Sequence, residues 1–321
     1  MAIEKLEVKG LKTYYFTRKG VVKAVEDFSF SLKKGESLGI VGESGCGKTT
    51  LGLSIIRLVP ASGKIVNGSI KLDGIDILKM DEVIFKKEIR WKKISMIFQG
   101  AMNALNPVYT IGYQISEPLI YHLGLSKKDA IKASMNALKE VGLNERIVKR
   151  FPHELSGGMK QRVVIAMAVV LKPDIVIADE PTTALDVIVQ AEIIDLLKKL
   201  KNEHKISIIL LTHDLRIIYK IVDKVAVMYA GELVEIGNME DIFYNSKHPY
   251  TQKLLASIPR LKDERSKLGY IPGVPPDLVN PPSGCKFSPR CPYSIDACKE
   301  KNPIEIQINH EHSVKCWLYM K

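Results

Sequence analysis

Residues 42–49 have the types and spacing that suit phosphate binding. They read Gly-Glu-Ser-Gly-Cys-Gly-Lys-Thr and fit the pattern G-x-x-x-x-G-K-[ST], whose glycines let backbone N–H groups curve around phosphate oxygens. An apolar run at 37–41 predicts a strand before the loop, and a helical pattern follows it, so the phosphates would meet a helix N-terminus, where the dipole favours anions. Lys48 would reach the terminal phosphates, and the Thr49 hydroxyl would bind Mg²⁺.

The loop therefore predicts a nucleotide site of backbone amides. Cys46 is interpreted as a small filler that contributes its amide. The residues expected to contact the nucleotide here are Gly42, Glu43, Ser44, Gly45, Cys46, Gly47, Lys48, Thr49 and Thr50.

A second acidic element supports the nucleotide interpretation. The buried-strand pattern at 175–178 leads into Asp179 and Glu180, and ligands gather at the carboxyl ends of strands in open α/β sheets. Asp179 would hold Mg²⁺, directly or through water, and Glu180 would act as general base toward an attacking water. The alternative is that the two acids cap the following helix, but the phosphate loop favours the catalytic interpretation.

The third element is Ser156-Gly157-Gly158 at the start of a predicted helix, within the stretch 155–162. A helix N-terminus of small residues is a second anion-binding feature. One chain does not need two such features for one terminal phosphate. We therefore expect that this helix N-terminus faces a nucleotide bound by a second subunit.

Together these motifs resemble the ATP-binding-cassette (ABC) ATPase superfamily. Six features of that superfamily occur in order over about 230 residues: 42–49, Gln99, 155–162, 175–180, 184–186 and His213. The resemblance implies that Gln99 touches Mg²⁺ or the lytic water and that His213 contacts the γ-phosphate. It also implies that Asp186 lies at a dimer seam and that Ser156 and Gly158 bind the ATP of the partner subunit. Capping of the helix after His213 is the alternative role for that histidine.

The resemblance also implies an aromatic ring that stacks on adenine. Tyr14, Tyr15 and Phe16 compete for this role. Side chains alternate across a strand, and alternation from Leu11 and Thr13 favours Tyr15.

The region after residue 237 is similar to the oligopeptide/dipeptide branch of these ATPases, which also contains nickel importers. The matching stretches are 105–107, 110–112, 248–255, 272–276 and 284–291. The branch implies import, driven by an ATPase that pairs head to tail with a copy or a paralogue. It further implies two membrane permeases and an extracytoplasmic peptide-binding protein.

Four of the five cysteines fall late in the chain and suggest a metal site. The gaps between them are five, six and 17 residues, wider than the pairs typical of Cys₄ zinc sites. Members of the branch with these four cysteines carry a [4Fe–4S] cluster, which is the favoured interpretation; Zn²⁺ and no metal are the alternatives. His310 or His312 could replace Cys316 in a zinc site, but solvent-exposed histidines are favoured there. The proposed cluster ligands are Cys285, Cys291, Cys298 and Cys316.

The secondary-structure patterns around these residues are typical of an α/β P-loop NTPase core. Short apolar runs at 37–41, 94–98, 175–178, 206–211 and 225–229 predict a mostly parallel buried sheet, with a hairpin from 225–229 to 234–236. A helical insertion is expected between strands, including a helix at 127–141 with Ser126 as N-cap.

These patterns predict two domains. An ABC ATPase domain covers 1–236, with a RecA-like core and a helical subdomain at about 100–162; a small irregular metal-binding region covers 237–321. Residues 270–303 hold eight of the 16 prolines, so this region needs a metal or docking onto the core for stability.

Composition narrows the function classes. The 321 residues carry 47 Lys+Arg and 36 Asp+Glu, a formal net charge of +11, and the mean hydropathy is +0.01, as in globular proteins. The longest apolar run has nine residues, against about 20 for a membrane span, and the N-terminus lacks a secretory signal pattern. The charge alone leaves nucleic acid, anionic lipid or nucleotide open as partners.

The resemblance to the oligopeptide/dipeptide branch implies an ATPase at the cytoplasmic face of the membrane that drives di- or oligopeptide import. One alternative is the same role for nickel or another solute. Another is a non-transport ABC ATPase of translation or DNA repair. The chain has one cassette and no basic stripe interleaved with aromatic residues, and both features argue against this alternative. A regulatory subunit without turnover is the third, against which Glu180 and His213 argue. No nucleic acid partner is expected, and the cargo is not determined.

Overall fold

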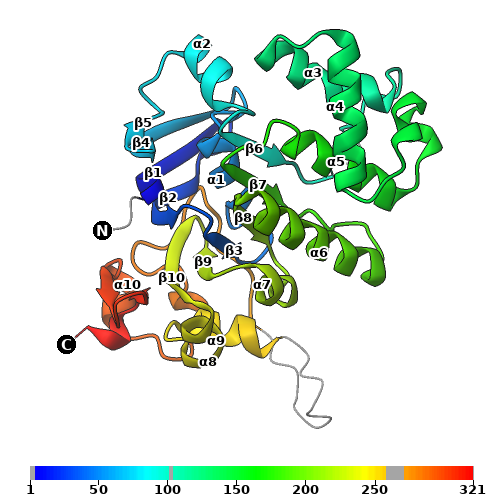
Figure 1. The fold of residues 1–321 in the computed structure, drawn as a ribbon. Helices are drawn as coiled ribbons and strands as arrows, with labels where there is room; N and C mark the ends of the chain where they lie inside the picture. Colours follow the sequence, from blue (N-terminus) through cyan, green and yellow to red (C-terminus); the bar gives the residue numbers. More distant parts are fainter. Residues whose placement is uncertain (1–3, 101–103, 258–270, 321) are drawn as a thin grey trace. The chain divides into compact units, whose positions relative to one another are not determined.

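The computed structural model describes residues 4–100, 104–257 and 271–320 (Figure 1). The chain forms two compact units. Unit 1 is Met1–Leu32, Ser37–Leu78 and Leu211–Lys321. Unit 2 is Lys33–Glu36 and Lys79–Leu210. The domain boundary predicted at residue 236 stays a prediction.

Unit 1 contains an antiparallel sheet with the strand order β2-β1-β4-β5. Its strands are β1 (Glu4–Thr17), β2 (Gly20–Lys33), β4 (Gly63–Leu72) and β5 (Ile75–Asp76). The register of β1 and β4 runs from Leu6 opposite Leu72 to Tyr15 opposite Gly63, with an irregularity around Lys12. Leu6 and Val8 are buried before the register shift that follows Lys9, and Leu11 and Thr13 are buried after it, so each part of β1 has the period-2 pattern of a strand with one face in the core.

A second set of strands in unit 1 carries the phosphate loop. The β3 strand (Ser37–Val41) pairs in parallel with β9 (Lys224–Tyr229), which forms a hairpin with β10 (Glu232–Asn238). The predicted hairpin is confirmed. Ala230 and Gly231 form its two-residue turn, both at positive φ, as a tight hairpin requires. All five residues of β3 are buried, as expected for a parallel strand covered on both faces.

The C-terminal part of unit 1 extends this sheet. The β12 strand (Ser313–Lys315) pairs with β10 and with β11 (Glu305–Gln307). The part of the chain after β10, called the tail below, is therefore held to the sheet by backbone hydrogen bonds. The predicted irregularity of the region 237–321 is confirmed for 271–287, which form neither helix nor strand. It is wrong for 239–245, 249–256 and 296–300, which are helices. The helices of unit 1 are α1 (Lys48–Ile55), α7 (Leu215–Ile221), α8 (Met239–Asn245), α9 (Pro249–Ala256), α10 (Asp296–Glu300), η5 (Ser288–Arg290) and η6 (Trp317–Tyr319).

Unit 2 contains the parallel pair β6 (Ile94–Ile97) and β7 (Ile175–Asp179) together with most of the helices. The β8 strand (Ser207–Thr212) begins in unit 2 and ends in unit 1. The α3 helix packs against α4, and α5 contacts both (Figure 1). The helices of unit 2 are α2 (Glu82–Ile84), η1 (Phe85–Ile89), α3 (Ile111–Leu123), α4 (Lys127–Glu140), η3 (Glu145–Lys149), η4 (Pro152–Glu154), α5 (Gly157–Val169) and α6 (Val187–His204).

Side-chain caps define where the helices of unit 2 begin. The predicted N-cap Ser126 is confirmed, because its side chain accepts a hydrogen bond from the Asp129 amide at the start of α4. Asp186 caps α6 in the same way, and Ser156 caps α5. Each cap satisfies an amide that has no partner inside its helix and contributes about 1 kcal/mol.

Candidate functional site

The phosphate loop of unit 1 requires glycine at two positions for steric reasons. Gly47 is the N-cap of α1 and has φ of 109°. A Cβ atom on Gly47 would lie 2.0 Å from the Ala24 carbonyl oxygen, and one on Gly42 would lie 2.1 Å from the Met228 carbonyl oxygen. The loop is therefore closely packed between β2 and β9, and its backbone amides can approach a ligand only if these positions lack side chains.

Lys48 and Thr49 stand at the first turn of α1, as predicted. The Lys48 ammonium is buried and donates to the carbonyl oxygens of Gly42 at 2.7 Å and Glu43 at 3.1 Å, so it lies inside the curve of the loop. Thr49 is exposed. Burial raises the pKa of the Cys46 thiol, although Lys48 lowers it, so Cys46 is a neutral buried group.

Tyr15 is the aromatic residue of β1 that reaches the helix after the loop. Its hydroxyl lies 3.2 Å from the Thr50 hydroxyl of α1. The Tyr14 hydroxyl donates instead to Glu26 at 2.6 Å, and Phe16 is exposed. This arrangement favours Tyr15 over its two neighbours as the ring nearest the loop.

In unit 2 the predicted catalytic carboxylate is held in place by two neighbours. Glu180 follows β7 with φ of 44°, a left-handed conformation that costs a non-glycine residue about 1–2 kcal/mol. The Gln99 amide donates to Glu180 Oε2 at 3.1 Å, and the Thr183 hydroxyl donates to the same oxygen at 3.0 Å. Asp179, immediately before, is 1% exposed at the end of β7. The structure thus brings Gln99 and Glu180 together although 81 positions separate them.

The predicted second anion-binding feature is present as a helix start in unit 2. Ser156 is exposed, and its hydroxyl accepts from the Met159 amide. A Cβ atom on Gly158 would lie 2.9 Å from Val189 of α6, so the glycine permits close packing of the two helices. Asp186 is exposed and caps α6. His213 follows β8 in unit 1, is exposed, and precedes Asp214, the N-cap of α7.

The four late cysteines lie in the docked tail of unit 1. Cys298 and Cys316 are buried, and the Cys285 amide donates to the Cys298 carbonyl at 2.8 Å. Burial, with a smaller contribution from the other three thiolates, raises the pKa of Cys285 to about 12. Among residues 4–100, 104–257 and 271–320, no group of three or more His, Cys, Asp or Glu side chains is arranged to hold a metal ion.

One expectation about the tail histidines was wrong. His310 is exposed, but His312 is 1% exposed and its Nε2 lies 2.8 Å from Glu235 of β10. The buried Glu235 carboxylate also accepts from the amides of Lys247 and His248. The pairing of β12 with β10 carries His312 inward, and no local pattern in the sequence signals that pairing.

Sequence reasoning also missed the partner of Glu43. Arg290 of the tail forms a bidentate ion pair with the Glu43 carboxylate, with N–O distances of 2.7 and 3.0 Å. Arg290 belongs to one of the branch motifs, but its position there does not indicate a partner 247 residues away.

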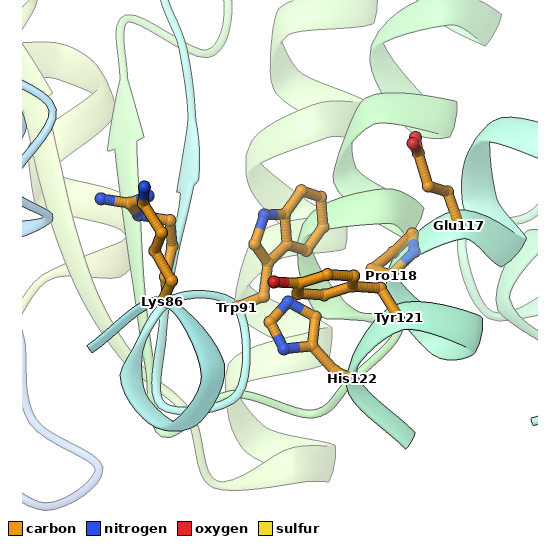
Figure 2. A pocket seen from close by; sticks show the side chains of 7 residues that line it. Lys86, Trp91, Glu117, Pro118, Tyr121 and His122 are labelled. Carbon is orange, nitrogen blue, oxygen red and sulfur yellow. The ribbon is translucent and has the colours of Figure 1, made fainter. Parts of the chain in front are cut away.

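Unit 2 also contains a pocket of about 300 Å³ that holds none of the predicted nucleotide residues. The rings of Trp91, Tyr121 and His122 point into it, with Lys86 on another side (Figure 2). Burial lowers the pKa of His122 below its ordinary value, although a hydrogen bond with the Lys87 carbonyl raises it. The pocket thus joins exposed aromatic surface to positive charge. Its lining is Lys86, Arg90, Trp91, Glu117, Pro118, Tyr121 and His122.

Comparison with known proteins places the chain. The ABC transporter family matches residues 25–183, and the family of the oligopeptide/dipeptide transporter C-terminal region matches residues 234–298. In the part of the chain that the structure describes, no helix has the apolar length to span a bilayer.

Curated relatives match nearly the whole chain. The dipeptide transport ATP-binding protein DppD of Bacillus subtilis (strain 168) is 47% identical over 317 residues, covering 98% of this chain and 94% of that protein. The oligopeptide transport ATP-binding protein OppD of Escherichia coli (strain K12) is 47% identical over 302 residues, covering 94% and 89%. A solved dimer of the ATP-binding cassette MJ0796, in a post-hydrolysis state bound to ADP and Pi, has a TM-score of 0.66 and 31% identity, covering 73% of this chain and 98% of its own. The chain is therefore an ABC ATPase with the α/β P-loop cassette fold, and it belongs to the oligopeptide/dipeptide transporter family.

Proposed function

We propose that this ABC ATPase is the ATP-hydrolysing subunit of a di- or oligopeptide importer. In this proposal the backbone amides of residues 42 and 44–50 and the Lys48 ammonium bind the phosphates, and the Tyr15 ring stacks on adenine. The Glu43 amide, which was also expected to contact the nucleotide, donates to the Tyr250 hydroxyl instead. The steric requirement for Gly42 and Gly47 and the position of Lys48 inside the loop support the phosphate assignment.

The observation that carries the hydrolytic role is the restrained conformation of Glu180. Gln99 and Thr183 both donate to one carboxylate oxygen, and the left-handed backbone fixes the direction of the side chain. Glu180 would take a proton from water as the water oxygen attacks the γ-phosphorus, with ADP as leaving group. His213 would contact the γ-phosphate and help to position that water.

The oxygen donors predicted for Mg²⁺ are of the kind that this ion prefers. They are the Thr49 hydroxyl, the Gln99 amide oxygen and the Asp179 carboxylate, which is buried at the end of β7. When bound with ATP, Mg²⁺ would neutralise charge on the phosphates.

Replacing Glu180 by Gln tests this assignment. The variant keeps the size of the side chain but cannot accept the proton, so turnover should fall by about 10² or more while ATP binding persists. Asp195→Asn, an exposed acid of α6, is the matched control and should hydrolyse ATP at the wild-type rate. Wild-type turnover by Glu180→Gln would refute the role of Glu180 as base.

We infer that the active form is a head-to-tail dimer in which Ser156 and Gly158 contact ATP bound by the other subunit, with Asp186 near the seam. All three residues are at least partly accessible at the starts of α5 and α6. The Glu180→Gln variant should therefore dimerise on addition of ATP, measured by light scattering after gel filtration. Adding Ser156→Arg to it should keep it monomeric; an unaffected dimer would contradict the inference.

The proposed partners are two membrane permeases at the cytoplasmic face, a second ATPase subunit that is a copy or a paralogue, and an extracytoplasmic peptide-binding protein. The pocket shown in Figure 2 is suited to receive a permease segment, because Tyr121 is 69% exposed beside the Trp91 indole. Large exposed aromatic side chains are enriched at protein interfaces.

Tyr121→Ala should weaken co-purification of the permeases while the isolated subunit hydrolyses ATP normally. Tyr244, an exposed tyrosine of unit 1, provides the matched control variant Tyr244→Ala. Complete retention of the permeases by Tyr121→Ala would exclude this pocket as their contact. Uptake of labelled dipeptides and of nickel by cells with and without the gene distinguishes the peptide importer from the nickel alternative.

We propose that the four tail thiols hold a [4Fe–4S] cluster. A cluster binds each thiolate through a different iron atom, so its ligands stand farther apart than the ligands of one ion, and the wide sequence gaps suit it. The mutual effect of the thiolates on the pKa of Cys285 supports their proximity. Bound there, a cluster would cross-link the proline-rich tail.

Anaerobic purification with iron, sulfide and zinc analysis tests the cluster. Brown protein with four irons per chain is expected. Colourless protein with one zinc, or with no metal, would reject the cluster. Because the nucleotide motifs lie outside the tail, this outcome would leave the ATPase assignment intact.

A further inference from the structure

Two of the short stretches that mark the branch meet at one residue of the phosphate loop, and a third braces the contact. Tyr250, from residues 248–255, accepts a hydrogen bond from the Glu43 amide at 2.9 Å. Arg290, from residues 284–291, forms two charged hydrogen bonds with the Glu43 carboxylate, at 2.7 and 3.0 Å. The third stretch, 272–276, contributes the Pro272 carbonyl that accepts from Arg290 Nε at 2.8 Å. The tail is therefore connected directly to the loop.

The Arg290 side chain is fixed before any ligand binds. It is only 5% exposed, and it also donates to the Ile271 carbonyl and the Tyr229 hydroxyl. Its guanidinium lies 5.7 Å from the centre of the Tyr229 ring. Because these contacts already hold the planar guanidinium in place, it loses little further conformational entropy on pairing with a carboxylate. The ion pair between Arg290 and Glu43 is therefore strong and directional.

Every polar group of Glu43 is engaged. Its amide donates to Tyr250, its carbonyl accepts from Lys48 and from the Cys46 amide, and its carboxylate is bound by Arg290. Rings of Tyr229, Tyr250 and Phe287 pack behind these contacts, with centroid separations of 4.6–5.4 Å. Residue 43 is thus the point at which the tail restrains the loop.

We propose that Arg290 is a positioning residue for ATP: it neutralises and orients Glu43, so that the phosphate loop can accept the triphosphate. Without Arg290, a carboxylate within the loop would repel the phosphates and would be free to turn toward the loop amides. The proposal rests on the assignment of residues 42–50 as the phosphate site. It gives the branch motifs of the tail a role in nucleotide affinity.

The test is a charge-cancellation series in the full-length protein. ATP affinity is measured with a fluorescent ATP analogue, and KM and kcat are measured for ATP hydrolysis. Arg290→Gln should raise Kd and KM about tenfold, equivalent to about 1.4 kcal/mol, with little change in kcat. Arg290→Lys, which keeps the charge but loses the fork, should fall between Arg290→Gln and wild type.

The double variant Arg290→Gln/Glu43→Gln tests whether Arg290 acts by neutralising the charge of Glu43 or only by holding the loop in place. It removes the charge that Arg290 balances, so ATP affinity should return to within about threefold of wild type. Lys299→Gln removes an exposed ion pair with Asp296 in the same tail and should change nothing. Failure of Glu43→Gln to restore affinity, or a fall in kcat alone, would overturn the proposal.

Two further variants cover other outcomes. If Arg290→Gln does not fold, Tyr250→Phe removes only the hydroxyl that accepts from Glu43; it should raise KM about threefold, and an unchanged KM would count against the proposal. Lys48→Ala tests the underlying assignment separately. Normal ATP binding by Lys48→Ala would refute the phosphate site itself, whereas loss of binding there with normal binding by Arg290→Gln would refute only the role of Arg290.

Discussion

Acid should destabilise unit 1 through one buried histidine, His248, which caps α9. Its Nδ1 accepts a hydrogen bond from the Tyr250 amide at 3.1 Å, and its own amide donates to Glu235. Burial lowers the pKa of His248 from 6.5 to about 4, although the charge of Glu235 raises it. A proton on Nδ1 would also remove the acceptor for the cap, so the folded protein keeps this imidazole neutral.

The sign and size of the effect follow from the two pKa values. The unfolded chain, with a histidine pKa of 6.5, binds a proton before the folded protein does as the pH falls. Stability is therefore complete above that value, is lost as the pH drops from 6.5 toward 4, and changes no further below both values. Linkage gives a loss of about 2 kcal/mol between about pH 7 and about pH 5 from His248 alone.

The assay is urea unfolding of the full-length protein at these two pH values. The variant His248→Asn keeps an acceptor suited to an N-cap but does not titrate, so its unfolding free energy should lose about 2 kcal/mol less than wild type between the two conditions. His310→Asn, at an exposed position, is the control and should behave as wild type. Equal pH dependence in wild type and His248→Asn would refute the reasoning.

Three further changes have outcomes that the structure predicts. Gly47→Ala should weaken ATP binding at least about 30-fold, equivalent to about 2 kcal/mol, because the new Cβ would meet a carbonyl oxygen at 2.0 Å; Gly74→Ala, at φ of 82° in open space, should bind ATP normally, and equal affinities would contradict the steric argument. Thr13→Val breaks a buried 2.8 Å hydrogen bond with Ser54 and should cost about 1–2 kcal/mol in urea unfolding, so an unchanged midpoint would count against it. Glu235→Ala leaves two backbone amides and the buried imidazole of His312 without their partner, so the free energy of unfolding should fall by about 3 kcal/mol or more. A fall of less than about 1 kcal/mol would contradict this prediction.

Local patterns were enough to find the motifs and the strands of the parallel core, but not the antiparallel sheet β2-β1-β4-β5 or the strands β11 and β12. The predicted strand at 37–41 coincides with β3, and the run at 175–178 lies in β7, which continues to Asp179. Ser126 begins α4 as expected. These features are encoded over a few residues, by apolar runs, caps and glycines, so they can be read without knowledge of distant contacts.

Pairings between distant segments could not be predicted in this way. Nothing near Arg290 in the chain identifies Glu43 as its partner, and nothing near His312 indicates that β12 pairs with β10 and carries this histidine to Glu235. The prediction that His312 is exposed was wrong for this reason. Which buried polar group meets which partner depends on strand register and loop path, and these are set by the packing of the whole unit.

Short motifs were sufficient to predict the chemistry of this protein: a phosphate loop, a strand ending in two acids, and tail motifs typical of one branch of the ABC ATPases. Each is a short pattern whose spacing is dictated by backbone geometry. How these parts restrain one another depends on the tertiary structure and could not be predicted from the motifs. The fold brings Gln99 and Thr183 to Glu180. It also pairs the buried Arg290 with Glu43, because a buried charge must have a partner regardless of its distance along the chain.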